Sequence, residues 1–450
     1  MKCKNHSLHF VFCAVFFTLC ICLWAQPEVW KHQPEKIQLK VNNDDNNYLS
    51  FIFQQDPSSE ITVIQILIKG GKRAAPVSQR GLAVITTRLS VEMTTATSVR
   101  ELMHLGSTFL YHVEGDYSTI TVKSLSENLE ETLAIITKVI KKPLFSGLRI
   151  RNIKKFMEHR KKREEDSPEQ LMELTCFKAF FAGTGKNDRD HGYAGSIFGD
   201  PDSRKKIKKK DIVHFYNRFF NRSHMVISVS SNLAKAEMET IIKKYFAGFP
   251  PGKPFEFQPV QSSIPTEKEF FLKRDNQQVL ISFAALLPGM SRENYVLIYM
   301  LENILGKGIG SKLWPLRAQK DLAYNLNSRF RQLKDAGLLI IYLKTDAEKK
   351  QEAYLALKEL ITDFYKTGIT KEELDITKVR ARADFLRENE TKVGKAQSLG
   401  YFDASGLGFD FIEAFFSYVE NVTVDDFNGY LKKVLNPDRL IEVTIGPEDQ

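Results

Sequence analysis

The segment LRAQKDLAY, residues 316–324, carries an arginine and a tyrosine whose side chains suit acyl chemistry. A guanidinium can bind a carbonyl or carboxylate oxygen, and a phenol can donate a hydrogen bond to an oxyanion. The glycine-rich run GKGIGSKL precedes the pair and an alternating stretch follows it. We therefore expect Arg317 on the last turn of a helix and Tyr324 near the start of a strand. On local grounds alone, a solvated arginine and a packing tyrosine are the favoured explanation of the two residues.

A second polar cluster lies in YHVEGDY, residues 111–117, where His112, Glu114 and Asp116 would share one face of a strand. A half-exposed edge strand shows the same alternation without any function. The sequence has no Cys-x-x-Cys, no Gly-x-Ser-x-Gly and no Walker motif, and no two histidines have the spacing of a metal site on a helix. Composition and motifs alone therefore assign no reaction.

The elements that must position these residues occur twice along the chain. Residues 117–143 and 338–365 each predict an alternating strand followed by an amphipathic helix, and a long charged helix follows both. Residues 211–230 and 426–445 each predict a short helix, an asparagine-led turn and a strand. A proline-rich linker, 250–265, separates the two series.

This repetition predicts an α+β fold with two homologous α/β sandwich domains, at 26–249 and 266–450. In each domain we expect a mostly antiparallel sheet with helices on one face. Two such halves would form a clam around a cleft, and clefts between domains are common ligand sites.

The first 25 residues have the features of a signal peptide. Lys2 and Lys4 precede an apolar stretch, and Ala25 offers a small residue for cleavage. The stretch is too short to span a bilayer comfortably, although an uncleaved anchor is an alternative. We expect an exported protein, periplasmic or secreted, with no membrane span after cleavage. Four of the five cysteines lie in this segment, which leaves Cys176 without a partner for a disulfide.

Positive charge is in excess, with a formal net charge of +9 and its densest run in RKKIKKK, residues 204–210. No aromatic residue interrupts that run, and the chain has the features of an exported protein. The run therefore indicates a solvated face or a weak attraction for acidic partners, and we expect no nucleic-acid partner.

Two longer stretches carry a resemblance to a known family. KGGKRAAPVSQRGLAVITTRLS, residues 69–90, resembles the N-terminal domain of the insulinase/pitrilysin and mitochondrial-processing-peptidase family of zinc peptidases, the inverted zincins. GKGIGSKLWPLRAQKDLAY, residues 306–324, resembles the matching stretch of that family's C-terminal domain, where Leu-Arg precedes an (Ala/Gly)-Tyr. The resemblance extends over nearly the whole chain after the signal peptide and implies the same two-domain fold.

The zinc motif of that family, His-x-x-Glu-His, follows a Gly-Leu-Ala-like triplet. Here the triplet at 81–83 is followed by VITTR, so Val84 and Arg88 stand at the histidine positions and Thr87 stands at the glutamate position. Zinc needs imidazole, thiolate or carboxylate ligands, and the mechanism needs a carboxylate to deprotonate the metal-bound water. Valine, threonine and arginine supply neither.

The family's third ligand is a glutamate on the long helix, and Glu158, Glu164 and Glu165 are the candidates here. One carboxylate cannot hold zinc. We therefore expect no metal and no other cofactor in this chain, and no peptidase activity from the chain alone.

In active members of the family, an Arg and a Tyr of the C-terminal domain reach the scissile peptide, and Arg317 and Tyr324 match those positions. Some bacterial relatives divide the zinc motif and the Arg/Tyr pair between two chains, and this sequence is similar to the second kind. The resemblance implies a substrate-contacting subunit of an exported heterodimeric zinc endopeptidase acting on peptides or small unfolded proteins, with zinc in a homologous partner. The alternative is a catalytically inactive peptide-binding or structural scaffold.

Overall fold

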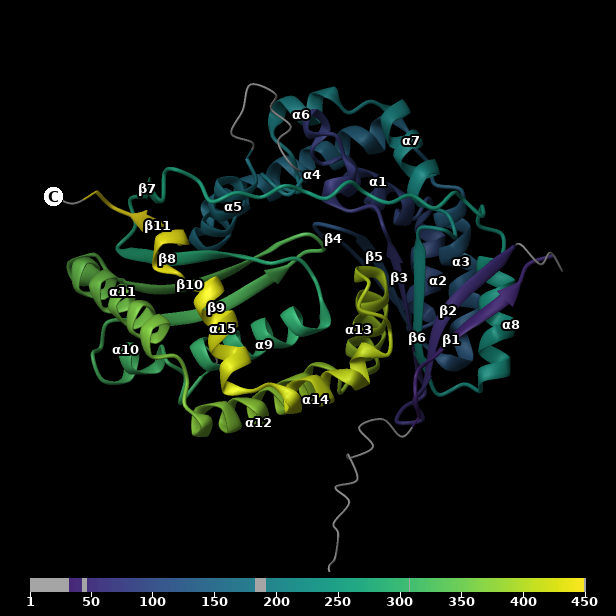
Figure 1. The fold of residues 1–450 in the computed structure, drawn as a ribbon. Coiled ribbons are helices and arrows are strands. Elements are labelled where there is room, and N and C mark those ends of the chain that lie inside the picture. Colours follow the sequence, from purple (N-terminus) through teal and green to yellow (C-terminus); the bar gives the residue numbers. More distant parts are fainter. Residues whose placement is uncertain (1–31, 43–46, 183–191, 307, 449–450) are drawn as a thin grey trace, which may run out of the picture. The chain divides into compact units, whose positions relative to one another are not determined.

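The computed structural model describes residues 32–42, 47–182, 192–306 and 308–448. The predicted signal peptide, residues 1–25, lies outside them. The described part contains two β-sheets with helices packed around them (Figure 1). Within the described ranges, every helix is too short or too polar to cross a membrane.

The first sheet has six strands, all from the N-terminal half of the chain. In spatial order they are β1 (Glu35–Lys40), β2 (Tyr48–Gln55), β6 (Met225–Ser231), β3 (Ile61–Ile68), β5 (Ser118–Leu125) and β4 (Thr108–Val113).

The second sheet has five strands, all from the C-terminal half. In spatial order they are β7 (Glu269–Lys273), β11 (Ile441–Gly446), β8 (Gln278–Leu287), β10 (Gly337–Asp346) and β9 (Asn325–Gln332).

The two sheets have the same topology once β1 is set aside. The pair β2–β6 is parallel in the first sheet, and the equivalent pair β7–β11 is parallel in the second. All other paired strands in both sheets are antiparallel. The predicted α+β fold with two homologous, mostly antiparallel halves is therefore confirmed. Residues 250–265 connect the halves and contain no helix or strand.

The helices also follow one order in both halves. Those of the N-terminal half are α1 (Leu82–Val91), α2 (Ala96–His104), α3 (Leu129–Lys141), α4 (Gly147–Asp166), α5 (Pro168–Phe181), α6 (Pro201–Lys206), α7 (Lys209–Phe219) and α8 (Lys235–Phe246). Those of the C-terminal half are α9 (Arg292–Gly306), α10 (Trp314–Ala318), α11 (Lys350–Thr367), α12 (Lys371–Glu388), α13 (Lys392–Ser405), α14 (Phe411–Asn421) and α15 (Val424–Val434).

Each sheet packs its own helices against one face. In β3, the alternate residues Ile64, Ile66 and Ile68 join a buried cluster with α1 and α3 residues such as Ile85 and Leu133. Because side chains alternate along a strand, the residues between them point to the opposite face. That second face must be covered by something else.

A helix of the other half covers that second face. Helix α13 lies on β3 and β6, where the Ser228 hydroxyl donates a hydrogen bond to the carbonyl of Ala396 over 2.6 Å. Gly400 permits this approach, because a Cβ there would lie 2.5 Å from Leu67 Cδ1 and 2.6 Å from Ser228 Oγ.

Helix α5 makes the reciprocal crossing onto the second sheet. Its residues Cys176 and Phe180 are fully buried in a cluster with Leu280, Ile340 and Val443. The halves therefore exchange one helix each, and both sheets are covered on both faces (Figure 1).

Candidate functional site

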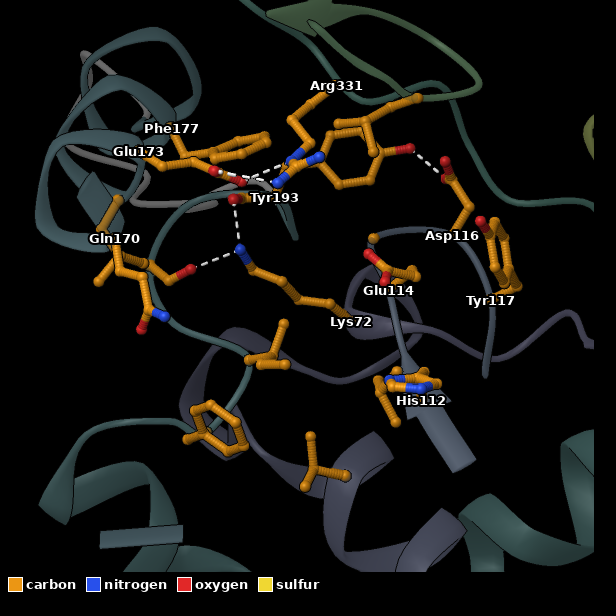
Figure 2. Close-up of a pocket in the computed structure, with 18 of the residues that line it drawn as sticks. Lys72, His112, Glu114, Asp116, Tyr117, Gln170, Glu173, Phe177, Tyr193 and Arg331 are labelled. Carbon is orange, nitrogen blue, oxygen red and sulfur yellow. Dashed lines mark hydrogen bonds and ion pairs between the residues drawn. The ribbon is translucent and has the colours of Figure 1, made fainter. Parts of the chain in front are cut away.

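A cavity of about 850 Å³ lies where the two halves meet. Its wall is formed by the end of β4 and the turn that follows, parts of α4 and α5, the end of β9, and single residues of α9 and α13. Figure 2 shows side chains from both halves converging on it. Its volume is within the usual range of ligand-binding sites.

The side of the cavity next to α1 carries the positions of the missing zinc motif. Val84 lines the cavity and is 2% exposed. The Arg88 guanidinium carbon lies 3.8 Å from the ring centroid of Phe156 on α4, and its Nη1 donates to the Tyr111 hydroxyl over 3.4 Å. Val84 and Arg88 are four residues apart and therefore share a helix face. At the two positions where the family has zinc-binding histidines, this chain has the methyl groups of a valine and an arginine stacked on an aromatic ring.

Thr87 and the candidate glutamates do not complete a metal site. Thr87 is fully buried, and its hydroxyl has no hydrogen-bond partner within the described residues. Glu164 lines the cavity, accepts a hydrogen bond from Ser196 Oγ and lies 3.6 Å from Lys161 Nζ. Glu158 and Glu165 are exposed and do not line it.

The donor set therefore does not fit zinc. Across the described ranges, no group of three or more His, Cys, Asp or Glu side chains is placed to hold a metal ion. The guanidinium at Arg88 is a permanent cation and repels a metal.

The opposite wall is built from charged groups that already have partners. Arg331 on β9 donates to Glu173 on α5 through Nε and Nη2, over 2.8 and 3.4 Å, and Arg329 Nη1 lies 3.6 Å from the same carboxylate. Lys72 Nζ donates to the carbonyls of Tyr193, over 2.6 Å, and Gly195 (Figure 2). Burial acts to lower the pKa of Arg331, but Glu173, with smaller contributions from Glu114 and Glu302, makes the net shift upward.

A buried arginine lies between two hairpin turns beside the cavity, where its partner Asp116 forms part of the wall. The side chain of Arg73 is 2% exposed and forms ion pairs with Asp116, over 3.0 Å, and Asp335, over 2.7 Å. It also donates to the carbonyl of Gln258 in the connecting segment, over 2.9 Å. Asp116 Oδ2 accepts from the backbone N–H of Lys334 over 3.0 Å. This cluster ties the β4–β5 turn to the β9–β10 turn.

The predicted polar cluster lines this cavity, but the prediction that it shares one strand face is wrong: β4 ends at Val113, so Glu114 and Asp116 lie in the turn that follows. His112, Glu114 and Asp116 all contribute to the wall, but Asp116 belongs to the ion-pair cluster and Glu114 does not. Burial is the main cause that raises the pKa of Glu114, and the negative charge of Glu173 adds to it. Arg331, His112 and Lys72 act in the opposite direction.

Three tyrosines line the cavity, and the charge of Glu114 acts on two of them, Tyr117 and Tyr401. The ring centroids of Tyr117 and Tyr401 are 5.7 Å apart, and those of Tyr401 and Tyr295 are 6.5 Å apart. All three line the cavity, and burial raises the pKa of each above its usual value. Their hydroxyls therefore stay protonated at neutral pH and act as hydrogen-bond donors.

The structure places Arg317 and Tyr324 outside this cavity. Helix α10 ends at Ala318, and Asp321 in the connection that follows has a φ of +48°. Arg317 is on the last turn of α10, exposed, with its guanidinium carbon 5.7 Å from the Trp314 ring centroid. Tyr324 directly precedes β9, is 58% exposed and donates to Asp346 over 2.8 Å. Their contact with substrate stays a prediction.

Sequence reasoning did not identify Lys72, Arg73, Glu173, Tyr193 or Arg331 as site residues. Lys72 and Arg73 lie in the KGGKR segment, but their partners come from distant segments. No local spacing could have linked them.

The duplicated sheets and the cavity between them define a two-domain, peptidase-like fold. The chain belongs to peptidase family M16, the insulinase family. The family model described as insulinase (peptidase family M16) matches residues 50–188, and the model described as peptidase M16 inactive domain matches residues 206–380.

Relatives are similar over most of the chain. The "Non-peptidase homolog YmxG" of Helicobacter pylori is 22% identical over 387 residues, which cover 85% of this chain and 88% of the relative. The "Uncharacterized zinc protease YmxG" of Bacillus subtilis is 21% identical over 398 residues, which cover 87% of this chain and 95% of the relative.

Solved structures show the same fold. The peptidase M16 inactive domain from Pseudomonas fluorescens has a TM-score of 0.82 at 21% identity, covering 92% of this chain and 98% of that one. A chain of complex III2 from Candida albicans has a TM-score of 0.76 at 13% identity, covering 91% of this chain and 95% of that one.

Proposed function

We propose that the chain is the non-zinc-binding, substrate-contacting subunit of an exported heterodimeric zinc endopeptidase that acts on peptides or small unfolded proteins. The observation that carries this proposal is the exposure of Arg317 and Tyr324 outside the chain's own cavity, while valine and arginine fill its zinc positions. An exposed pair is available to a second chain. Tyr324 is also held by its hydrogen bond to Asp346.

In the proposed heterodimer, a homologous subunit with an intact His-x-x-Glu-His motif supplies the zinc. Arg317 would bind a substrate carbonyl or carboxylate, and Tyr324 would release Asp346 and donate its single O–H to the developing oxyanion of the substrate. The export part of the proposal rests on the predicted signal peptide, residues 1–25, and N-terminal sequencing of the native protein, expected to begin at Gln26, tests it.

The second candidate is a catalytically inactive peptide-binding or structural scaffold. The cavity within this one chain favours it, since a ligand can bind there without a partner. The name "Non-peptidase homolog" of the Helicobacter pylori relative is also in line with it.

Reconstitution with a zinc-motif homologue from the same source distinguishes the two candidates. The assay measures cleavage of an unfolded peptide by each chain alone and by the mixture, with and without a chelator. We expect cleavage in the mixture only, abolished by the chelator, and no stoichiometric zinc in this chain by elemental analysis. A partner that is fully active alone and unchanged on mixing contradicts the heterodimer, and one tightly bound zinc in this chain contradicts the interpretation of its zinc positions.

A further inference from the structure

Glu114 differs from the other carboxylates that line the cavity. Asp116 pairs with Arg73, Glu164 accepts from Ser196, and Glu173 pairs with Arg331. Glu114 has no hydrogen bond or ion pair from its carboxylate to any described residue. Glu114 is an exposed residue in the wall of the cavity, so its negative charge faces the cavity space and attracts a cationic ligand group.

The hydroxyl groups of the three tyrosines that line the cavity also have unused hydrogen-bonding capacity. Tyr295 is 9% exposed, and its hydroxyl has no hydrogen-bond partner within the described part of the chain. The same holds for the hydroxyls of Tyr117 and Tyr401. Tyrosine rings attract cations to their faces, and a hydroxyl oxygen can accept a hydrogen bond from an ammonium group.

We propose that this end of the cavity binds an alkylammonium group, with Glu114 as its carboxylate acceptor and Tyr117 and Tyr401 as its aromatic contacts. An ammonium is compact and has three donors, which a carboxylate and neighbouring hydroxyl oxygens can satisfy. Two observations on separate elements support the site: the unpartnered carboxylate after β4, and the unpartnered hydroxyl of Tyr295 on α9.

The cations already in the cavity do not take this role. The Lys72 ammonium is held by two backbone carbonyls, and Arg331 is held by Glu173. Figure 2 shows both engaged on the side of the cavity away from Tyr117. Both act on Glu114 electrostatically, but neither forms a hydrogen bond or ion pair with its carboxylate in the described part of the chain.

Two sources can present an alkylammonium: a lysine side chain within a peptide, or a free small amine. The cavity volume of about 850 Å³ admits either. The site lies within this one chain and needs no zinc-bearing partner. Its test is therefore independent of the heterodimer proposed above.

Titration calorimetry on the full chain after signal cleavage, at pH 7.5, tests the proposal with three probes. These are acetyl-Ala-Lys-Ala-amide, the same peptide with norleucine in place of lysine, and n-butylamine. We expect the lysine peptide to bind at least tenfold more tightly than the norleucine peptide. Binding of butylamine as tight as that of the lysine peptide assigns the site to free amines, and tighter binding of the peptide assigns it to lysine side chains.

Single substitutions test which residues contact the ammonium group. Glu114→Gln keeps the side-chain size and removes the charge, and we expect it to weaken the preferred probe by about 10- to 100-fold. Tyr401→Phe keeps the ring and should weaken it by less. Glu158→Gln, on the exposed surface of α4, is the matched control and should leave affinity unchanged.

Several outcomes overturn the proposal. They are equal binding of the lysine and norleucine peptides, no measurable binding of either peptide or of butylamine, and full affinity in Glu114→Gln. The comparison of the two peptides uses the wild-type chain, so it stands even if a variant fails to fold.

Discussion

Replacing Arg73 by methionine tests whether the buried ion-pair cluster holds the two halves together. The change leaves two carboxylates, Asp116 and Asp335, without their shared cation, and removes a hydrogen bond to the connecting segment. Removing one partner of a buried pair typically costs about 3–5 kcal/mol. The side chains of the two aspartates are 20% and 15% exposed, and each keeps a backbone N–H donor, which reduces the cost. We expect the free energy of unfolding to fall by about 2–4 kcal/mol.

Urea unfolding followed by tryptophan fluorescence measures the loss. Arg292→Met is the matched control: Arg292 pairs with Asp410 over 2.8 Å, but that aspartate is 55% exposed, so the loss should be about 1 kcal/mol or less. A double-mutant cycle of Arg73→Met with Asp335→Asn should give a coupling energy above about 1 kcal/mol. Limited proteolysis should also cut the segment 250–265 faster in Arg73→Met. A loss no larger than that of Arg292→Met would refute the reasoning.

Three further perturbations test the other features. Arg88→Ala removes the aromatic stacking and should cost about 1–2 kcal/mol in urea unfolding while leaving zinc content unchanged; an unchanged midpoint contradicts the stacking role. In the reconstituted heterodimer, Tyr324→Phe should lower turnover by about ten- to a thousandfold and Arg317→Ala should mainly raise KM, both with unchanged melting temperatures. Tyr48→Phe, at another exposed tyrosine, is the control. Full activity in both the Tyr324 and the Arg317 variants would mean that the pair has no function in cleavage. Because burial raises the pKa of Glu114, affinity for the lysine peptide should increase as the pH rises through that raised value, and a flat profile between pH 4 and 8 in calorimetry contradicts this.

The sequence alone determined the repeated fold and the loss of the zinc motif, because both are local patterns. Hydrophobic periodicity shows each strand and helix within a short window, so the same series could be recognised on both sides of the linker. The positions of Val84 and Arg88 lie within one turn of one helix, so their failure as ligands follows from residue type alone. The end of α10 at Ala318 does not follow from the local sequence, because the ends of short helices depend on contacts with distant residues.

The tertiary structure decided which distant groups meet. An apolar helix face does not specify which sheet it covers, so the exchange of α5 and α13 between the halves was not visible in the sequence. Arg331 and Glu173 are far apart in the chain and pair only because α5 crosses to the second sheet. Glu114 and Asp116 look alike in the sequence, yet one lies beside a buried arginine and the other does not. Charges interact through space, so only the folded structure distinguishes Asp116, which pairs with an arginine, from Glu114, which does not.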